Sequence, residues 1–453
     1  MPAILRNRTY RRLFTAQLVA LVGTGLATVA LSLLAYDIAG DHASAVLGTA
    51  LAIKMVAYVT IAPLAGALAD RIPRRALMVA MDLTRAAVAL TLPFVTQVWQ
   101  VYALIFLLQA ASAAFTPTFQ ATLPEVLPAE RDYTRALSLS RLAYDLESLF
   151  SPALAAGLLA LLSSGWLFAG TAAGFLASAA LVVSAVLPKP APVERAGGVY
   201  AKAAFGTRLF WATPRLRALL ALDLGVAAAG AIVFVNTVVL VREHFHRPAG
   251  ALSLALGAYG AGSVLAALLL PRVLGRIGDR AVMLPAAFAL PVVLAGVAAV
   301  TATAPSAWSW GAVLTAWAAI GAACSAVLTP GGRVLRRSAA DADLPAAFAA
   351  QFSLSHSCWL LTYPLAGWLA AGAGLPATAA ALGAVALASA AAATALWPAR
   401  EAAELDHVHA DLPPDHPHLG DAHPAAGGWR HGHRFVIDQY HRRWPAHGDV
   451  RPG

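Results

Sequence analysis

The chain has 453 residues, of which 59% are hydrophobic and only 12% are charged. Soluble domains carry about 25% charged residues, so this composition excludes a soluble globular fold and indicates a protein that crosses the membrane many times. The formal net charge of +9 does not predict nucleic-acid binding, because the basic residues lie in short loops between apolar runs. Cys324 and Cys358 lie within apolar runs and predict buried thiols rather than a disulfide framework.

The first apolar run follows a group of arginines and continues to about Tyr36. It is longer than the apolar core of a signal peptide, which has about 7–15 residues, and therefore predicts a spanning helix. Apolar runs of similar length recur along the chain, and helices are expected because unpaired backbone groups cannot face lipid. The expected spans are 12–37, 45–69, 75–96, 99–122, 138–163, 166–187, 215–241, 250–274, 282–302, 307–330, 348–371 and 374–397.

The basic residues between the spans predict the orientation in the membrane. With the N-terminus inside, nearly all of them fall in inner loops, and the outer loops hold only Arg242 and Arg247. Cytoplasmic loops carry an excess of lysine and arginine. We therefore expect an integral protein of a bacterial-type inner (plasma) membrane with both termini in the cytoplasm.

The chain also predicts an internal repeat. The stretch "DRIPRRALM" (70–78) matches "GRIGDRAVM" (275–283) at an offset of 275 − 70 = 205 residues. We expect an all-α polytopic protein, whose twelve transmembrane helices form two six-helix halves related by a parallel pseudo-repeat. The expected regions are the N-terminal half (1–187), a Pro- and Gly-rich cytoplasmic linker (188–213), the C-terminal half (214–398) and a histidine-rich tail (399–453).

The loop "GALADRIPRR" (66–75) resembles a loop motif of the major facilitator superfamily, approximately G-x-x-x-D-R-x-G-R-R. The resemblance extends over residues 5–398 and implies the twelve-helix fold and transport by alternating access. In the family, this cluster acts as a gate latch that forms in one conformation and breaks in the other. Pro73 stands where the family usually has glycine, which changes the turn because proline fixes φ near −65°.

The residues of this motif have separate expected roles. Gly66 allows close helix approach, and Asp70 can pair with arginines or cap a helix N-terminus. Arg71, Arg74 and Arg75 are expected to hold the loop against the anionic leaflet.

A narrower resemblance points to export. The stretch "LFTAQLVALVGTGLATVALSLLAYDIAG", with "ADRIPRR" and "MDLTRA", resembles the twelve-span drug–proton antiporters that include macrolide and siderophore exporters. The stretch "SPALAAG" (151–157) resembles their antiporter motif G-P-x-x-G-G, with Ser151 and Ala156 replacing glycines. The fourth expected span lacks the arginine that many proton-coupled members carry, and Gln109 is its only amide.

Ionisable residues within spans are costly and are functional candidates by default. Lys54 is expected near the midplane, either in the transport cavity or in a structural ion pair. Asp145 and Glu147 point about 200° apart around one helix, so only one of them can face the cavity and bind a proton or a cation. Asp145 could instead pair with Arg141, which lies one helical turn away.

The strongest single candidate for proton coupling or cation binding is Asp223, which has no evident local partner. His356 could titrate near neutral pH or ligate a metal, or it could be a hydrogen-bonded packing residue. Asp82 and Arg85 are expected to pair locally at i,i+3.

The tail begins with "DHVHADLPPDHPHLGDAH" (406–423) and contains nine of the thirteen histidines. Its prolines argue against a helix, and extended H-x-H segments suit Ni, Co or Zn. The expected ligands are His407, His409, His416, His418, His423, His431 and His433. The alternative is a disordered, solvating tail, although "RFVIDQYHRRW" (434–444) is apolar enough to dock on the cytoplasmic face. The tail resembles the histidine-rich C-termini of nickel and cobalt resistance exporters of the same superfamily.

Two transport hypotheses follow. The first is proton-coupled efflux of small organic toxicants or drugs, and the second is export of a divalent cation such as nickel or cobalt. A metal sensor on a transporter fold is a third alternative, whereas an enzyme is not expected because no nucleophile–base pair or H-E-x-x-H motif occurs. The expected partners are the lipid bilayer, the substrate and protons, and the protein is expected to be a monomer with no resident cofactor, apart from metal bound by the tail.

Overall fold

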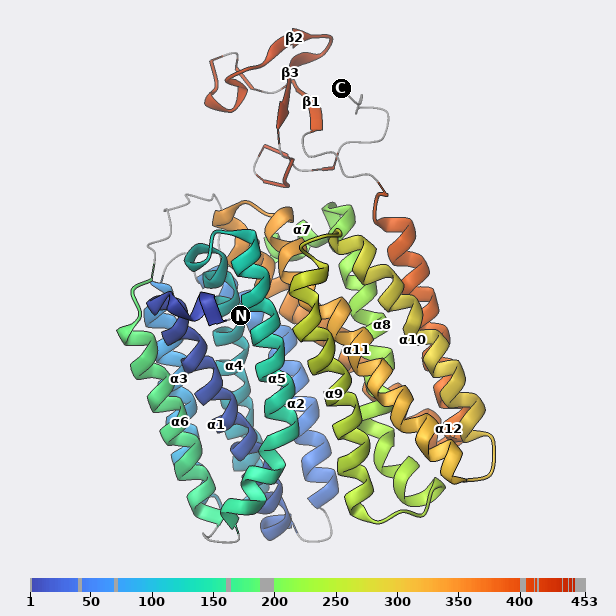
Figure 1. The fold of residues 1–453 in the computed structure, drawn as a ribbon. Coiled ribbons are helices and arrows are strands. Elements are labelled where there is room, and N and C mark those ends of the chain that lie inside the picture. The colour runs from blue at the N-terminus through green and yellow to red at the C-terminus, as the bar shows by residue number, and fades with distance from the viewer. Residues whose placement is uncertain are drawn as a thin grey trace.

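A computed structural model describes residues 2–39, 43–68, 72–159, 164–187, 199–399 and 405–444, except 411, 414, 434, 439 and 442. Long helices pack side by side in one bundle, and a small β-structure made by the tail stands at one end of it (Figure 1). We call this end of the bundle the tail end. The chain is therefore all-α apart from the tail.

Each of the twelve expected spans falls on a helix. The helices are α1 (Arg8–Ala39), α2 (Ala43–Leu68), α3 (Arg74–Thr91), α4 (Val98–Val126), α5 (Glu130–Leu159), α6 (Ser164–Ser184), α7 (Val199–Ala212), α8 (Pro214–Val239), α9 (Ala249–Val273), α10 (Asp279–Thr301), α11 (Ala307–Ser338) and α12 (Leu344–Leu396). Short helical turns are η1 (Pro2–Arg6), η3 (Leu92–Phe94), η4 (Leu240–His244) and η5 (Asp341–Asp343). We refer to α1–α6 as the first half and to α8–α12 as the second half.

Eight helical ranges in the described part of the chain are long and apolar enough to cross a membrane. One of them, 341–396, contains two of the expected spans, and its 53-residue helix α12 would be about 80 Å long if straight. The helix breaks at Gly374, where φ is 81°, close to the expected boundary between the two spans. The total of twelve spans stays a prediction.

The two halves have the same pattern of helix contacts. In the first half, α1 packs against α5 and α6, α2 packs against α4, and α3 packs against α4 and α6. In the second half, α8 and α10 pack against α12, α9 packs against α11, and α10 also packs against α11. Each helix of the second half thus has the neighbours of its counterpart in the first half.

The stretch expected as a linker contains the helix α7, which the sequence did not predict. Phe205, Leu209 and Phe210 of α7 are buried, and α7 packs against α2, α8 and α12. A Cβ atom added at Gly206 would lie 2.3 Å from the carbonyl oxygen of Ala346. The backbones of α7 and α12 therefore approach so closely that only glycine fits.

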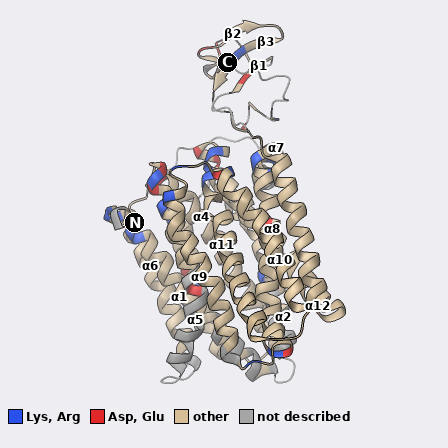
Figure 2. Ribbon diagram, turned by 45° about the vertical axis from the view of Figure 1, so that its right-hand side comes forward, with Lys and Arg blue, Asp and Glu red and all other residues tan. Residues whose placement is uncertain are grey.

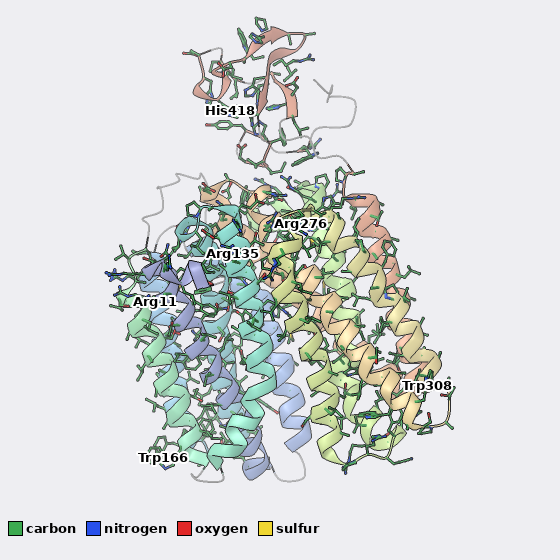
Figure 3. The ribbon with its side chains drawn as sticks, in the orientation of Figure 1. Arg11, Arg135, Trp166, Arg276, Trp308 and His418 are labelled. Carbon is green, nitrogen blue, oxygen red and sulfur yellow. The ribbon has the colours of Figure 1, made fainter. Side chains whose placement is uncertain are left out.

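Charge and tryptophan separate the two ends of the bundle. Lys and Arg side chains gather at the tail end (Figure 2), where Arg11, Arg135 and Arg276 lie (Figure 3). Trp166 and Trp308 lie at the opposite end (Figure 3), with exposed side chains. Tryptophan favours the interface between lipid and water, and the two ends therefore resemble two different membrane surfaces.

The tail folds into a three-stranded antiparallel sheet rather than a helix. Its strands are β1 (Leu405–His409), β2 (His423–Ala425) and β3 (Gly428–His433), arranged in the order β1–β3–β2. The turn η6 (Pro417–Leu419) lies between β1 and β2. The extended conformation agrees with the predicted H-x-H segments.

Helices α9 and α11 generate the first prediction because they meet through glycines. A Cβ atom at Gly262 would lie 1.8 Å from the carbonyl oxygen of Ala318, whereas a Cβ atom at Gly257 of the same helix meets nothing within 4 Å. Overpacking typically costs about 1–3 kcal/mol. We expect Gly262→Val to lower the unfolding temperature of the purified protein by several degrees, and Gly257→Val to change it little. Equal unfolding temperatures for the two variants would contradict this close approach.

Candidate functional site

Four charged side chains form an ion-pair network at the tail end. Glu130 is the first residue of α5, and Asp279 is the first residue of α10. Arg333, near the end of α11, lies 2.8 Å from Glu130 (Nη2 to Oε1) and 2.8 Å from Asp279 (Nε to Oδ1). Arg337, one helical turn further on, also pairs with Glu130 and lies 3.0 Å from Asp279. The network thus links the first half to the second.

The network is half-buried and is placed at helix ends that favour its charges. The two carboxylates lie at helix N-termini and the two arginines at a helix C-terminus, where each charge complements the helix dipole. Asp279 and Arg333 are almost fully buried, whereas about half of the Glu130 side chain is exposed. Partial burial alone would raise the pKa of Glu130, but Arg337 and Arg333 together hold it below the ordinary glutamate value.

Neighbouring hydrogen bonds close the same junction between α5 and α11. The Tyr133 hydroxyl donates to the Gly332 carbonyl over 3.2 Å, and Arg336 donates to the Pro128 carbonyl over 2.8 Å. Both ion pairs that join the two halves among the described residues, Arg333–Glu130 and Arg337–Glu130, lie here. The sequence did not predict this network, because Glu130 lies 207 residues from Arg337 and Asp279 lies 58 residues from it.

The loop motif is only partly within the described residues. Gly66 lies in the last turn of α2, but its surroundings, Asp70 and Arg71 lie outside the described part. Arg74 is buried, and its Nη1 lies 2.7 Å from Glu125 Oε1 on α4. The expectation that Arg74 contacts lipid headgroups is therefore wrong, because its charge is paired inside the first half. Arg75 is exposed and donates to the carbonyl of Val183 over 2.5 Å.

The internal repeat places opposite charges at equivalent positions. Arg74, displaced by the repeat offset of 205 residues, corresponds to Asp279, because 74 + 205 = 279. Each is the first residue of its helix, and each pairs with a residue near the end of the next long helix. Arg74 pairs with Glu125 of α4, and Asp279 pairs with Arg333 of α11. The second half thus keeps the pair but reverses its polarity. This reversal leaves an arginine, Arg333, beside Glu130 of the first half.

A polar and aromatic cluster lies between the halves, deeper in the bundle. Tyr58 of α2 contacts Phe352 and His356 of α12, with ring centroids 4.9 and 4.7 Å apart. The Tyr58 hydroxyl donates to Gln109 on α4 over 2.9 Å, and the Lys54 amine lies 5.5 Å from the Tyr58 ring. The Nδ1 atom of His356 donates to the Phe352 carbonyl over 2.6 Å. Its Nε2 atom is thereby left as the acceptor.

Glu147 on α5 is half-buried, and the positive charge of Lys54 interacts electrostatically with its carboxylate. The side chain of Asp145, the other carboxylate proposed for this helix, lies outside the described part. Arg141, its expected partner, donates to the Ser263 hydroxyl on α9 over 3.2 and 3.3 Å. Arg141 is therefore a contact between the halves.

Asp223 is buried in α8, and Gln351 of α12 is its polar partner. Gln351 donates to Asp223 Oδ2 over 2.7 Å, while the Oδ1 atom has no hydrogen-bond partner among the described residues. Gln351 was not predicted as a partner, because it lies 128 residues away along the chain. By contrast, Asp82 pairs with Arg85 as predicted, and Ser178 donates to Asp82 over 2.8 Å. Cys324 and Cys358 are buried and are not joined by a disulfide, also as predicted.

Five histidines of the tail converge on one point. The set is His407, His418, His431, His433 and His441, and each offers one ring nitrogen within 4.8 Å of the others. The strand register explains part of this convergence, because His407 lies directly opposite His431. In the two H-x-H pairs that lie on strands, 407/409 on β1 and 431/433 on β3, both side chains point to the same face of the sheet. Four of the expected ligands thus belong to the cluster.

Three expected ligands lie outside this set. His409 borders it, with its Nε2 atom 3.1 Å from that of His407. His416 accepts a hydrogen bond from the backbone of His418, and His423 is exposed on β2. His441 was missed, although Asp438 three residues earlier is a local sign of an oriented histidine. Burial first, and then the neighbouring histidines, lower the pKa of His407, His418 and His431 to about 4.

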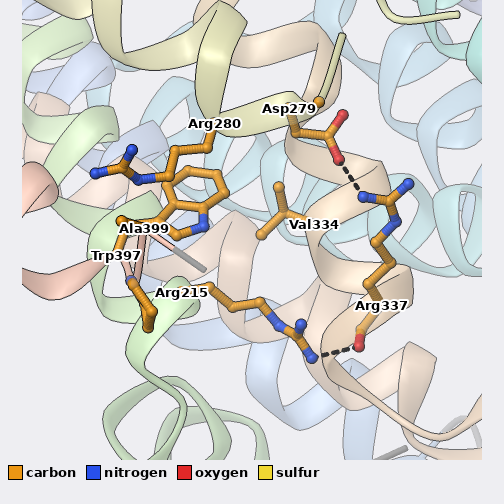
Figure 4. Close-up of a pocket in the computed structure, with 9 residues that line it drawn as sticks. Arg215, Asp279, Arg280, Val334, Arg337, Trp397 and Ala399 are labelled. Atoms are coloured by element: carbon orange, nitrogen blue, oxygen red, sulfur yellow. Dashed lines mark hydrogen bonds and ion pairs between the residues drawn. The ribbon is translucent and has the colours of Figure 1, made fainter. Parts of the chain in front are cut away.

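A pocket of about 160 Å³ lies at the tail end, beside the ion-pair network (Figure 4). Arg215, Arg280, Arg337, Asp279 and Trp397 are among the residues that line it. Arg215 donates to the Arg337 carbonyl over 2.6 Å and to the Ser338 hydroxyl over 2.7 Å. The start of α8 is thereby fixed to the end of α11.

Comparison with known proteins agrees with this architecture. The sequence profile of the Major Facilitator Superfamily matches residues 13–237. The chain is 27% identical over 220 residues to YfiS, an uncharacterized MFS-type transporter of Bacillus subtilis (strain 168). That match covers 47% of this chain and 52% of the relative, so it spans about half of the relative's length.

Three solved structures have the same fold at low sequence identity. The human organic anion transporter MFSD10 (TETRAN) superposes with a TM-score of 0.72 at 14% identity, over 85% of this chain and 99% of that one. The Escherichia coli fucose:proton symporter FucP gives 0.67 at 13%, over 86% and 98%. A bacterial homologue of the iron transporter ferroportin, in an outward-facing state, gives 0.68 at 13%, over 86% and 99%. The chain is thus similar to the Major Facilitator Superfamily in sequence over residues 13–237, and it shares the fold of these transporters over most of its length.

The ion-pair network generates a second prediction. Glu130→Gln removes both ion pairs between the halves, and a partly exposed ion pair contributes roughly 0.5–1 kcal/mol. We expect the tail end to open several-fold more often. The measurement is labelling of Ser357→Cys, in a background without Cys324 and Cys358, by a membrane-impermeant thiol reagent applied from the tail end. Ser357 lies one turn from Ser353, which bonds across the halves to Val59.

Asp132→Asn is the matched control for Glu130→Gln. Asp132 lies two residues away and pairs only with Arg135 of its own helix in the described part of the chain. Its removal should leave the labelling rate unchanged. Equal labelling rates for both variants and the parent protein would show that the network does not control opening of the tail end.

Proposed function

We propose that the protein is a secondary active transporter that exports small organic toxicants or drugs in exchange for protons. The tail end would face the cytoplasm, which the gathering of Lys and Arg at that end supports (Figure 2). Both termini would then be cytoplasmic, in a bacterial-type inner membrane. The two six-helix halves, 1–187 and 214–398, would rock about a central site, with 188–213 as the linker.

The ion-pair network would be the cytoplasmic closure of this cycle. It joins the halves through Glu130, which pairs with both Arg333 and Arg337. A partly exposed network can break and re-form at small cost, which a latch requires. Asp70, Arg71 and Arg75 of the loop motif, with Gly66, would contribute to the same closure, as the family resemblance of this motif implies.

The aromatic lining between the halves is the observation that carries the choice of substrate. Tyr58 of the first half contacts Phe352 and His356 of the second half. Further along α12, Trp359 lies 5.1 Å from Tyr363 and 6.0 Å from Phe234 of α8. Sites for small organic molecules are mostly apolar and aromatic, with a few polar groups that fix orientation. Lys54, Glu147 and His356 would supply those polar groups here.

Asp223 would carry the exchanged proton. Its hydrogen-bond partner in the described part of the chain is a neutral amide, so a charged carboxylate would be costly in this interior, whereas a protonated one would not. It lies nine residues into α8, about 14 Å along the helix. This depth suits a carboxylate that exchanges protons with each membrane face in turn. The fourth-span arginine of many relatives is not required in this scheme.

Export of a divalent cation is the second candidate, and the histidine cluster of the tail favours it. Glu147, Asp145 and Asp223 could then bind the cation in transit. Against this, the grouped metal ligands among the described residues lie in the tail and not between the spans.

A comparison of accumulation in cells separates the two candidates. Cells that express the full chain should accumulate less of at least one compound in a panel with a macrolide and a lipophilic dye, compared with vector cells. Their nickel and cobalt contents should equal those of vector cells. Lower metal content with unchanged organic compounds would overturn the proposed substrate class.

Proton coupling gives a third prediction. In proteoliposomes, Asp223→Asn should reduce proton-driven transport of the exported compound more than tenfold, because the amide cannot carry the proton. Exchange of labelled for unlabelled compound, which needs no net proton movement, should stay within about threefold. Asp341→Asn, which alters an exposed carboxylate at the tail end, is the control. Driven transport that survives in Asp223→Asn would contradict the assignment.

A further inference from the structure

The five clustered histidines come from four separate parts of the tail. His407 lies on β1, His418 on η6, and His431 and His433 on β3, while His441 lies in the segment after the sheet. His407, His431 and His441 are buried. Burying several polar rings together costs free energy unless their nitrogen atoms have partners. The arrangement therefore needs a partner for these atoms.

The hydrogen bonds of two rings fix where their lone pairs point. The Nδ1 atom of His407 lies 2.9 Å from the Leu405 carbonyl, which can only accept, so Nδ1 carries the proton. The Nδ1 atom of His441 donates in the same way to the Asp438 carboxylate over 3.0 Å. In the neutral rings the two Nε2 atoms are both acceptors, yet they lie 2.9 Å apart. A cation between or beside them resolves this contact.

A single proton shared between two nitrogen atoms would resolve one such contact, but the cluster contains further nitrogen atoms that lack a partner. The Nε2 atoms of His418 and His431 are also buried and have no hydrogen-bond partner among the described residues. A metal ion can bind one ring nitrogen of all five histidines at the same time. Ligating histidines typically donate their other ring nitrogen to a carbonyl or a carboxylate, which is the arrangement of His407 with Leu405 and of His441 with Asp438.

We propose that His407, His418, His431, His433 and His441 bind one divalent transition-metal ion, with Asp438 as the residue that positions His441. The ligands are all imidazoles, which suit Ni²⁺, Co²⁺, Cu²⁺ and Zn²⁺. Structural zinc sites almost always have four ligands, so five histidines favour Ni²⁺ or Co²⁺. The site does not depend on what the spans transport.

The bound ion has a direct structural route to the ion-pair network. Phe435 contacts His407 and Trp444, with ring centroids 5.1 and 5.2 Å apart, and the Arg215 guanidinium lies 5.6 Å from the Trp444 ring. Arg215 in turn holds the end of α11 through the Arg337 carbonyl. Metal binding would order the segment that carries His441 and Trp444. It would thereby hold Trp444 on Arg215 and favour the closed tail end, a consequence that rests on the proposed transport function.

Metal binding to the purified full-length protein tests the site itself. Equilibrium dialysis with Ni²⁺ and with Co²⁺ should give one tightly bound ion per chain. His407→Ala and His441→Ala should each weaken binding at least tenfold, and Asp438→Asn about 10–100-fold, while the visible spectrum of bound Co²⁺ keeps its shape in Asp438→Asn. His423→Ala, which alters an exposed histidine of the same tail, should bind as the parent protein does.

Other outcomes overturn the site. If His423→Ala and His441→Ala weaken binding equally, or if several ions bind with similar affinity, the tail is an unstructured collector of metal. If neither His407→Ala nor His441→Ala changes the affinity, the five-histidine site is wrong. Unfolding temperatures and retained export of the organic compound show that the bundle of each variant is folded.

The regulatory step has a separate test in proteoliposomes. Added Ni²⁺ should slow export by the parent protein severalfold compared with a chelator, and Trp444→Ala should abolish this difference while it still binds one ion. A metal effect that persists in Trp444→Ala, or no effect in the parent protein, would overturn the link to the network. Neither result would alter the dialysis result or the export activity itself.

Discussion

A charge buried in a membrane interior is expensive, and the positions of this chain's few charged residues follow from that constraint. Arg85, for example, is buried within the bundle and has partners there in Asp82 and two phenylalanine rings. Asp223 differs from Arg85, because a neutral amide is its partner. Ionisable residues that stay in a membrane interior mark function, and Asp223 therefore stands apart from the structural pairs.

The same constraint accounts for the ion pairs at equivalent positions of the two halves. An ion pair at the start of α3 satisfies Arg74 within the first half, and its counterpart at α10 has the opposite polarity. With an arginine at the end of α11, the second half can bind a carboxylate of the first half as well as its own. A pair that stabilises one half thus becomes a contact that also joins two halves. The tail is fixed to this same corner through Arg215 and Trp444.

Local patterns in the sequence predicted what depends on neighbours along the chain. These include the helical ranges, the Asp82–Arg85 pair and the extended H-x-H strands. Contacts between distant residues carry no local pattern, so Glu130 with Arg333, Asp223 with Gln351, and His441 with His407 were not predicted. Arg74 was misplaced for the same reason, because its burial depends on Glu125 of another helix. The helix α7 was missed because proline and glycine dominate the stretch before it.

We propose that the two halves close at the tail end through Glu130 and reopen during transport. The most direct test of this proposal is the distance between spin labels at Arg131 and Arg276, which are exposed residues of the first and second halves, in the protein reconstituted in lipid. We expect a short and a long distance, with the long one more populated in Glu130→Gln. A single distance, unchanged by substrate, by pH and by Glu130→Gln, would contradict it.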